Sequence, residues 1–431
     1  MATIRERSTA VFEEVTVESS DRARATAPSV VAATTGAPLG RGAMLRVATD
    51  VGASVEIEVS ENRRFRGSRR LRAARTDDFR AAAVAVRGLP AGRRVYWRAR
   101  VRRKGRETVG PVRSFRVLPR AGTNGSAAVA VGACAAQFGP AFDQIAARRP
   151  DAFVWQGDLN YPDTHGPLAQ TMTGYAGIWR DFLANPRLAP VLRRSAFVAM
   201  RDDHDYGAQD SNASTLGSHP WGVEPWDALF GAGAGYRFSA GPADVWVLDQ
   251  RRFKTDPTAP DDGAKTLLGA RQRSWLLRGL RSSTAPFKVI CSPCTLLMPY
   301  NARDGNWAAG FTAERDRIFR TIDRKVTGRV VFVTGDTHLT GVYDQDDRYE
   351  ARACPIGIPV PNDITISDPG AAERLRKTKG VTYADERCHY AVLDLDSSEN
   401  AATLDISLRR DDGAVPYRKT FTEPIPRSEP G

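Results

Sequence analysis

The stretch Phe153-Val154-Trp155-Gln156-Gly157-Asp158-Leu159-Asn160-Tyr161 decides the predicted fold. It begins as a short apolar run, which is typical of a strand buried on both faces, and it ends in Gly-Asp with a tyrosine three residues later. We expect the strand to deliver the carboxylate of Asp158 and the phenol of Tyr161 to one edge of a sheet. Because both groups can bind metal ions, the stretch predicts one half of a metal site.

Three further apolar runs end in residues that can bind metal. They are 127–131 before Cys134, 197–200 before Asp202-Asp203-His204-Asp205, and 330–333 before Gly335-Asp336-Thr337-His338. In open α/β sheets, ligands bind outside the carboxyl ends of the strands, so these ends can converge on one place. A single Gly-Asp is also ordinary turn chemistry, but together the strand ends carry two of the five histidines. The combination predicts a metal site.

The rest of the chain predicts two domains. Residues 28–119 contain short runs that alternate with period two between turn signals, which predicts an antiparallel β-sandwich. The turn-rich segment 119–125 is the expected boundary. From 125 to 431, apolar runs alternate with helical stretches, which indicates an α/β core. Residues 1–27 show no strong periodicity and are left unassigned as an N-terminal arm.

The net charge of +12 is concentrated in one segment. Residues 28–119 hold 21 Arg plus Lys and 7 Asp plus Glu, a balance of +14, which leaves −2 for the rest of the chain. This asymmetry suits attraction to an anionic polymer or a phospholipid surface. The alternative is an Arg-rich solvated face that has no partner.

Composition and length restrict the class of protein. A hydrophobic fraction of 42% with 26% charged residues indicates a globular chain. No run approaches the roughly 18 apolar residues of a membrane-spanning helix, and the first 27 residues lack the apolar centre of a secretory signal. As written, the chain is therefore expected in the cytoplasm. Five cysteines, an odd number in a long chain, do not suggest a disulfide framework.

In this order the motifs resemble those of the PhoD-type alkaline phosphatases in the metallophosphoesterase superfamily. The motifs are Cys134, Gly-Asp-x-x-Tyr at 157–161, Asp-Asp-His-Asp at 202–205 and Gly-Asp-x-His at 335–338. The Gly-Asp-x-x-Tyr also resembles purple acid phosphatases, but Cys134 and the paired aspartates argue against them. The pattern around Tyr96-Trp97 similarly resembles a fibronectin-type-III-like module.

The resemblance implies a four-layer α/β/β/α core, hydrolysis of phosphate esters, and iron with calcium as metals. Members of this family are usually exported, although this chain shows no signal. Phospholipase D activity occurs in relatives of this type.

The donor types also allow the metals to be assigned from chemistry alone. The first position combines the thiolate of Cys134, the carboxylate of Asp158, the phenolate of Tyr161 and the imidazole of His338. This set suits Fe(3+). Asp158 as a bridge, with Asp203 and Asp336, gives an all-oxygen second position that suits Ca(2+), Mg(2+) or Mn(2+). A hydroxide between two such metals could attack phosphorus in line while the metals neutralise the leaving oxygen.

His204 is the predicted catalytic residue, because it follows Asp203 and is not needed as a ligand. It would contact the phosphoryl oxygen or protonate the leaving group. The neighbouring Asp202 and Asp205 either orient His204 or hold the loop.

Three other residues are candidates for substrate binding. Arg201 either binds phosphate or pairs with a nearby carboxylate, and Asn160 is either near the site or simply a turn residue. His165 follows Tyr161 by four residues and could face the substrate. The segment Cys291-Ser292-Pro293-Cys294 lacks a second cysteine pair at zinc-site spacing, so we expect burial or a local thiol pair.

The function predicted from these residues is metal-dependent hydrolysis of phosphate esters. The ligand set does not separate monoesters from diesters, because both reactions need the same nucleophile and charge neutralisation. A phosphodiesterase or phospholipase D that acts on anionic or phospholipid substrates is therefore the alternative enzyme. A non-catalytic polyanion-binding protein on the same fold is the alternative outside the enzymes.

Overall fold

The computed structural model describes residues 27–120, 124–231, 233, 235–298, 304–357 and 370–425. All but the last residue of the unassigned arm at 1–27 therefore lies outside the described residues. No helix among the described residues is long and apolar enough to cross a membrane.

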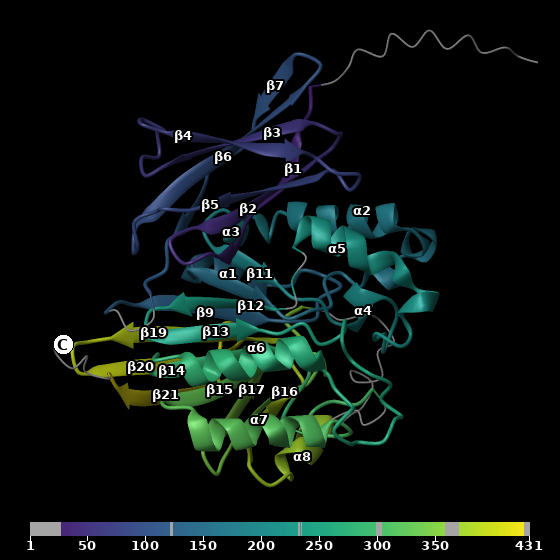
Figure 1. The fold of residues 1–431 in the computed structure, drawn as a ribbon, viewed down its shortest axis with the longest axis vertical. Coiled ribbons are helices and arrows are strands. Elements are labelled where there is room, and N and C mark those ends of the chain that lie inside the picture. Colours follow the sequence, from purple (N-terminus) through teal and green to yellow (C-terminus); the bar gives the residue numbers. More distant parts are fainter. Residues whose placement is uncertain are drawn as a thin grey trace, which may run out of the picture.

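Two large sheets form the centre of the molecule (Figure 1). The nine-stranded sheet has the order β21 (Tyr417–Pro424), β20 (Ala401–Arg410), β19 (His389–Ser397), β9 (Ala127–Gly132), β10 (Ala152–Trp155), β11 (Ala196–Ala199), β1 (Val30–Pro38), β2 (Ala43–Thr49) and β5 (Ala81–Val86). The seven-stranded sheet has the order β12 (Tyr236–Ala240), β13 (Ala243–Val247), β14 (Phe287–Ser292), β15 (Arg329–Thr334), β17 (Arg348–Arg352), β16 (Thr340–Gln345) and β18 (Val381–Asp385).

Helices cover the outer faces of both sheets. The α-helices are α1 (Ala141–Arg148), α2 (Met172–Ala184), α3 (Ala189–Leu192), α4 (Asp203–Tyr206), α5 (Val223–Leu229), α6 (Gly269–Ser282), α7 (Thr312–Lys325) and α8 (Ala371–Arg376). Short 3-10 helices are η1 (Pro162–Thr164), η2 (Gly166–Gln170), η3 (Leu216–Ser218) and η4 (Pro220–Gly222). In Figure 1, α6 and α7 lie on the opposite side of the stacked sheets from α2 and α5.

The alternation of side chains along β10 explains these layers. Val154 packs into the core between the two sheets, whereas Phe153 and Trp155 pack against α1, α2 and α5. A separate core joins the seven-stranded sheet to α6 and α7, with Leu276 and Ile318 as members. The order helix, sheet, sheet, helix confirms the predicted α/β/β/α core.

A smaller sheet lies over the N-terminal strands. Its order is β4 (Arg69–Arg75), β3 (Ser54–Ser60), β6 (Arg94–Arg103) and β7 (Arg106–Val109), with β8 (Arg113–Arg116) also paired to β6. Side chains of β1, β2 and β5 pack against it, and Trp97 lies fully buried between the two layers. The region 28–119 is thus β-rich and layered, while its fibronectin-type-III-like character remains a prediction.

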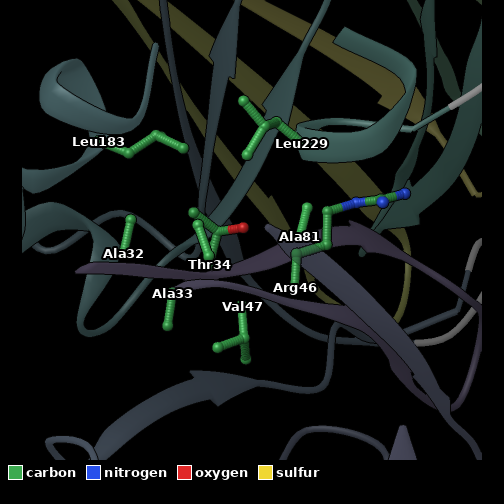
Figure 2. A pocket seen from close by; sticks show the side chains of 9 residues that line it. Ala32, Ala33, Thr34, Arg46, Val47, Ala81, Leu183 and Leu229 are labelled. Atoms are coloured by element: carbon green, nitrogen blue, oxygen red, sulfur yellow. The ribbon is translucent and has the colours of Figure 1, made fainter. Parts of the chain in front are cut away.

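The N-terminal strands are also continuous with the large sheet. β1 pairs in parallel with β11, where Thr35 lies opposite Ala196. Figure 2 shows Leu183 of α2 and Leu229 of α5 above Ala32 and Thr34 of β1, around a cavity of about 10 Å³. The predicted boundary at 119–125 remains a prediction, and residues 121–123 lie outside the described part of the chain. Hydrogen bonding and packing nevertheless connect the two predicted domains.

Candidate metal centre

The donor residues follow four strands, three in the nine-stranded sheet and one in the seven-stranded sheet. Cys134 follows β9, Asp158 follows β10, Asp203 follows β11, and both Asp336 and His338 follow β15. Strands β9, β10 and β11 run in register, with Gly132 opposite Trp155 and Trp155 opposite Ala199, so their carboxyl ends stop at the same level. The strand ends therefore bring these residues to one edge, as the sequence predicts.

Five residues of the centre adopt left-handed backbone conformations. Their φ angles are 60° at Cys134, 58° at Asp158, 44° at Tyr161, 68° at Asp336 and 48° at His338. Such conformations are uncommon for residues other than glycine, and they cost free energy that the surrounding structure must offset. Their concentration at one place is typical of a functional site.

Gly157 allows two of these loops to approach closely. Its φ is 101°, and a Cβ placed there would lie 2.3 Å from the Cβ of Asp202. Only glycine fits both the backbone conformation and the contact. The glycine of the Gly-Asp pair thus brings the loop after β10 against the loop after β11.

Cys134, Asp158 and His338 form the first group of potential ligands, with one donor atom of each lying within 4.8 Å of the others. The Sγ of Cys134 is 3.5 Å from Oδ2 of Asp158, and Nε2 of His338 is 4.0 Å from the same oxygen. The phenol oxygen of Tyr161 lies 2.7 Å from Nε2 of His338. The structure therefore brings together all four residues predicted for the first metal position.

Asp158 also belongs to a second group, with Asp203 and His204, while Asp203 forms a third group with Asp202 and Asp336. The predicted second position, Asp158 with Asp203 and Asp336, is spread over these two overlapping groups. His204, the predicted catalytic residue, is itself a member of the second group of potential ligands.

The electrostatics of the centre favour bound cations. Burial and the carboxylates of Asp203 and Asp202 raise the pKa of Asp158 well above its usual value. Burial and the neighbouring Cys354 thiol likewise raise the pKa of the Cys134 thiol well above its usual value. Oδ1 of Asp158 and Oδ1 of Asp203 are buried without a hydrogen-bond donor. Because buried charges are normally paired or bind metals, these residues fit a metal centre.

Arg251 supplies part of the missing positive charge. Its fully buried guanidinium contacts Asp202, Asp304 at 2.9 Å, Asp336 at 3.3 Å and Asp203 at 3.5 Å. Sequence reasoning missed this residue. Its position four residues after the end of β13 is the same kind of signal that marked the other strand ends.

His204 is held by a carboxylate that the sequence did not identify. Nδ1 of His204 lies 2.8 Å from Oδ2 of Asp163, and its ring lies 4.5 Å from that of Tyr161, measured between centroids. Burial opposes the charged form, but the carboxylates of Asp203 and Asp163 raise the pKa of His204 to about 9. The only available signal for Asp163 was its position two residues after Tyr161.

The two acidic neighbours of His204 have structural roles. Asp205 accepts hydrogen bonds from the backbone N–H of Asp158 at 2.7 Å and of Leu159 at 3.0 Å, and Asp202 pairs with Arg251. These contacts favour the alternative in which Asp202 and Asp205 hold the loops. The orienting contact to His204 comes from Asp163.

The remaining substrate-binding candidates have other contacts. Arg201 is fully buried and pairs with Asp227 at 2.6 Å and Asp249 at 3.5 Å, so the ion-pair alternative replaces the phosphate role. Nε2 of His165 is 3.0 Å from the backbone oxygen of Asn160, whose φ of 66° fits a turn. These contacts favour the turn role for Asn160. That His165 faces the substrate remains a prediction.

Three further cysteines, Cys291, Cys294 and Cys354, are buried free thiols. The Sγ of Cys354 lies 3.0 Å from that of Cys134, a neighbour that the sequence gave no reason to expect. Cys291 and Cys294 are both buried, but Cys291 packs between the sheets and Cys294 packs against α6 and α7. Burial is thus the observed alternative for the Cys291–Cys294 segment.

Comparisons with known proteins indicate a likeness to PhoD-like phosphatases. Residues 234–359 match the family model of the PhoD-like phosphatases. Alkaline phosphatase D of Bacillus subtilis (strain 168) is 34% identical in a match of 113 residues, with a coverage of 22% of this chain and 19% of that protein. The matched segment is thus about a fifth of the length of that curated relative. The predicted resemblance to PhoD-like phosphatases is confirmed over this segment.

Solved structures extend the likeness to most of the chain at the level of fold. The structure of PhoD has a TM-score of 0.70 at 17% identity and covers 94% of this chain and 93% of its own. A purple acid phosphatase from yellow lupin (Lupinus luteus) seeds has a TM-score of 0.67 at 12% identity, covering 91% of this chain and 74% of its own. The arrangement of sheets and helices is therefore that of PhoD and of this purple acid phosphatase.

Proposed function

We propose that this protein, which carries a PhoD-like phosphatase segment at 234–359 within a PhoD-like fold, hydrolyses phosphate esters in a metal-dependent reaction. The observation that carries the proposal is the position of Asp158. It is the one carboxylate shared by the Cys134–His338 group and the Asp203–His204 group, and its Oδ1 has no donor. A shared carboxylate between two donor groups is the arrangement that a pair of metal ions requires.

The donor chemistry supports two different ions. Cys134, Tyr161, His338 and Asp158 combine sulfur, phenol, imidazole and carboxylate, which favours Fe(3+). Asp158, Asp203 and Asp336 offer only oxygen, which favours Ca(2+), with Mg(2+) or Mn(2+) as alternatives. When bound, the ions would supply positive charge for the phosphoryl oxygens and lower the pKa of a nucleophilic water.

The protein's own residues provide the proton. Asp163 holds the ring of His204 through Nδ1, so Nε2 is the nitrogen that would transfer the proton. Burial opposes the charged form, but the carboxylates of Asp203 and Asp163 raise the pKa of His204, which favours a protonated ring that can donate to the leaving oxygen. His204 thus acts as the general acid, and Asp163 positions it.

Asp205 of α4 and Arg251 hold this arrangement in place. Asp205 fixes the backbone of Asp158 and Leu159 through two hydrogen bonds. Arg251 keeps Asp203 and Asp336 near each other, since their repulsion would otherwise separate them. The site is therefore preorganised to stabilise the transition state.

Hydrolysis assays test the proposal directly. p-Nitrophenyl phosphate and bis(p-nitrophenyl) phosphate are supplied to the purified protein after loading with Fe(3+) and Ca(2+). We expect turnover of at least one of the two, abolished in Asp158→Asn and Cys134→Ala. Turnover of the diester alone would favour the phosphodiesterase or phospholipase D alternative. Absence of turnover of both, with metals bound, would favour the non-catalytic polyanion-binding protein.

The basic charge of residues 28–119 supports a second anionic partner besides the substrate. This partner would be an anionic polymer or a phospholipid surface. Part of this charge is neutralised within the small sheet, where Glu58 pairs with Arg98 at 2.7 Å and with Arg100 at 3.5 Å. Many arginines of the segment, including Arg63 and Arg94, remain exposed.

A further inference from the structure

A cavity of about 570 Å³ lies away from the metal centre, between the small sheet and the segments that precede β10 and β11. It is lined by Arg113 and Ser114 at the start of β8 and by Arg94 and Tyr96 of β6. The volume falls in the range of about 300–1,000 Å³ that is typical of small-molecule sites.

Arginine dominates the lining. Arg63, Arg94, Arg113, Arg149, Arg193 and Arg194 all line the cavity, and no acidic residue does so in the described part of the chain. Within that part, none of the six forms an ion pair with a carboxylate. Because arginine offers a planar fork of donors that matches phosphate oxygens, such a cluster favours phosphoryl groups.

Arg113 is the second observation that points to a ligand. Only 8% of its surface is exposed, and its buried Nε and Nη1 have no hydrogen-bond partner. Burial and the neighbouring Arg193 lower its pKa to about 10, which reflects the cost of keeping this charge without a counter-ion. Buried polar groups are almost always satisfied, so the two unpartnered N–H groups of this cation are available to donate to a bound anion.

Hydrogen bonds join the two sides of the cavity. The N–H of Ser114 donates to the oxygen of Arg193 at 2.7 Å, and Nη1 of Arg94 lies 3.2 Å from Oγ of Ser114 and 3.3 Å from the oxygen of Arg194. These bonds tie β6 and β8 to the loop between α3 and β11. The cavity is therefore part of the packed junction.

The cavity is separate from the metal centre. Arg149 precedes β10, and Arg193 and Arg194 precede β11, whereas Asp158 and Asp203 follow these strands. Each strand has four residues and spans roughly 13 Å. The two sites thus lie at opposite ends of the same strands.

We propose that this cavity binds a phosphate chain of two or more phosphoryl groups, held by the six arginines with the buried Arg113 at the centre. Several cations converge on a space larger than orthophosphate needs, so a condensed phosphate is the matching anion. The site does not depend on the proposed hydrolytic function.

Calorimetric titration with tripolyphosphate tests the site. We expect binding to full-length wild type and to Asp158→Asn, which removes the contribution of the metal centre. Arg113→Gln and the double variant Arg193→Gln/Arg194→Gln should each weaken binding at least tenfold. The matched control is Arg271→Gln/Arg278→Gln, two exposed arginines of α6, which should bind like wild type. An additional titration with adenosine triphosphate shows whether the site also binds a triphosphate that is attached to a nucleoside.

Three results would overturn the proposal. Loss of binding in Asp158→Asn would assign all phosphate binding to the metal centre. If tripolyphosphate binding weakened equally in Arg193→Gln/Arg194→Gln and in the control, the effect would come from net charge alone. Unchanged binding in both cavity variants would show that the arginines do not hold the anion. Failure of the hydrolytic proposal would instead appear as metal-loaded wild type that binds tripolyphosphate without turning over p-nitrophenyl phosphate.

Discussion

At the scale of single residues, Asp158 and His204 explain most of the proposed chemistry. Asp158 is buried among other carboxylates, yet its backbone is fixed by Asp205 and its Oδ1 has no donor. His204 has a carboxylate partner on one nitrogen and lies against Tyr161. In the proposed mechanism, the first residue holds cations and the second holds a proton.

We predict that His204→Gln lowers kcat for p-nitrophenyl phosphate by about 10²–10⁴-fold, because general acid catalysis typically contributes that factor. Asp163→Asn should lower kcat by a smaller factor, since it removes the group that orients the ring. Steady-state kinetics with metal analysis checks both. A His204→Gln protein with bound metals and wild-type kcat would exclude His204 as the acid.

Sequence reasoning identified the centre at this scale only in part. Cys134, Asp158, Tyr161, Asp203, Asp336 and His338 were recognisable because each follows a buried strand in a short motif. Asp163, Arg251 and Cys354 were missed because their partners are distant in sequence; Cys354 meets Cys134 across 220 positions. Motifs indicate the donors, but tertiary packing selects their neighbours.

At the scale of elements, the turn after β10 requires a glycine, and the interior of β14 contains a buried lysine. Gly157 must allow the loops after β10 and β11 to touch. Lys288 of β14 is fully buried, and its Nζ donates to the backbone oxygens of Ala285 and Thr327. Both positions can be tested by single substitutions.

We predict that Gly157→Ala lowers the free energy of unfolding by about 3 kcal/mol, through a left-handed backbone and a Cβ contact with Asp202. Gly217→Ala is the matched control, because its Cβ would meet nothing within 4 Å, and it should change stability by less than about 0.5 kcal/mol. Urea unfolding measures both. Equal effects of the two variants would contradict the close approach.

Lys288 predicts a specific pH dependence. Burial lowers its pKa from 10.5 to about 8, so between these values the unfolded chain binds more protons and stability rises with pH. The cost of the buried charge is fully present below pH 8. Relative to Lys288→Met, wild type should therefore gain stability between pH 8 and pH 10.

Unfolding in urea at pH 7.5 and pH 10 measures this difference. Lys325→Met, which replaces an exposed lysine at the end of α7, is the control and should show no such change. A constant difference between wild type and Lys288→Met across this range would show that the lysine titrates normally.

At the scale of the whole molecule, the sequence predicted the layers but not how the N-terminal strands join them. Period-two alternation identified strands at 28–119, and buried runs identified the α/β core. The pairing of β1 with β11 depends on Thr35 lying opposite Ala196, and neither residue carries a local signal for it. Strand order is set by packing between distant segments, so alternation alone could not reveal the continuous sheet.

We predict that residues 125–431 expressed alone do not form a stable protein, because removal of β1, β2 and β5 exposes the edge of β11 and the apolar faces of α2 and α5. The fragment should aggregate or lack a cooperative thermal transition, compared with the full chain under the same conditions. A soluble fragment that melts cooperatively would show that the continuous sheet is not needed for folding.

The metal content of the purified protein tests the central claim most directly. Elemental analysis of wild type after exposure to Fe(3+) and Ca(2+) should find one iron and at least one calcium bound per chain. Asp158→Asn, which alters the carboxylate shared by both donor groups, should lose both metals together. Wild type without bound metal, or Asp158→Asn with the full wild-type content, would contradict the account.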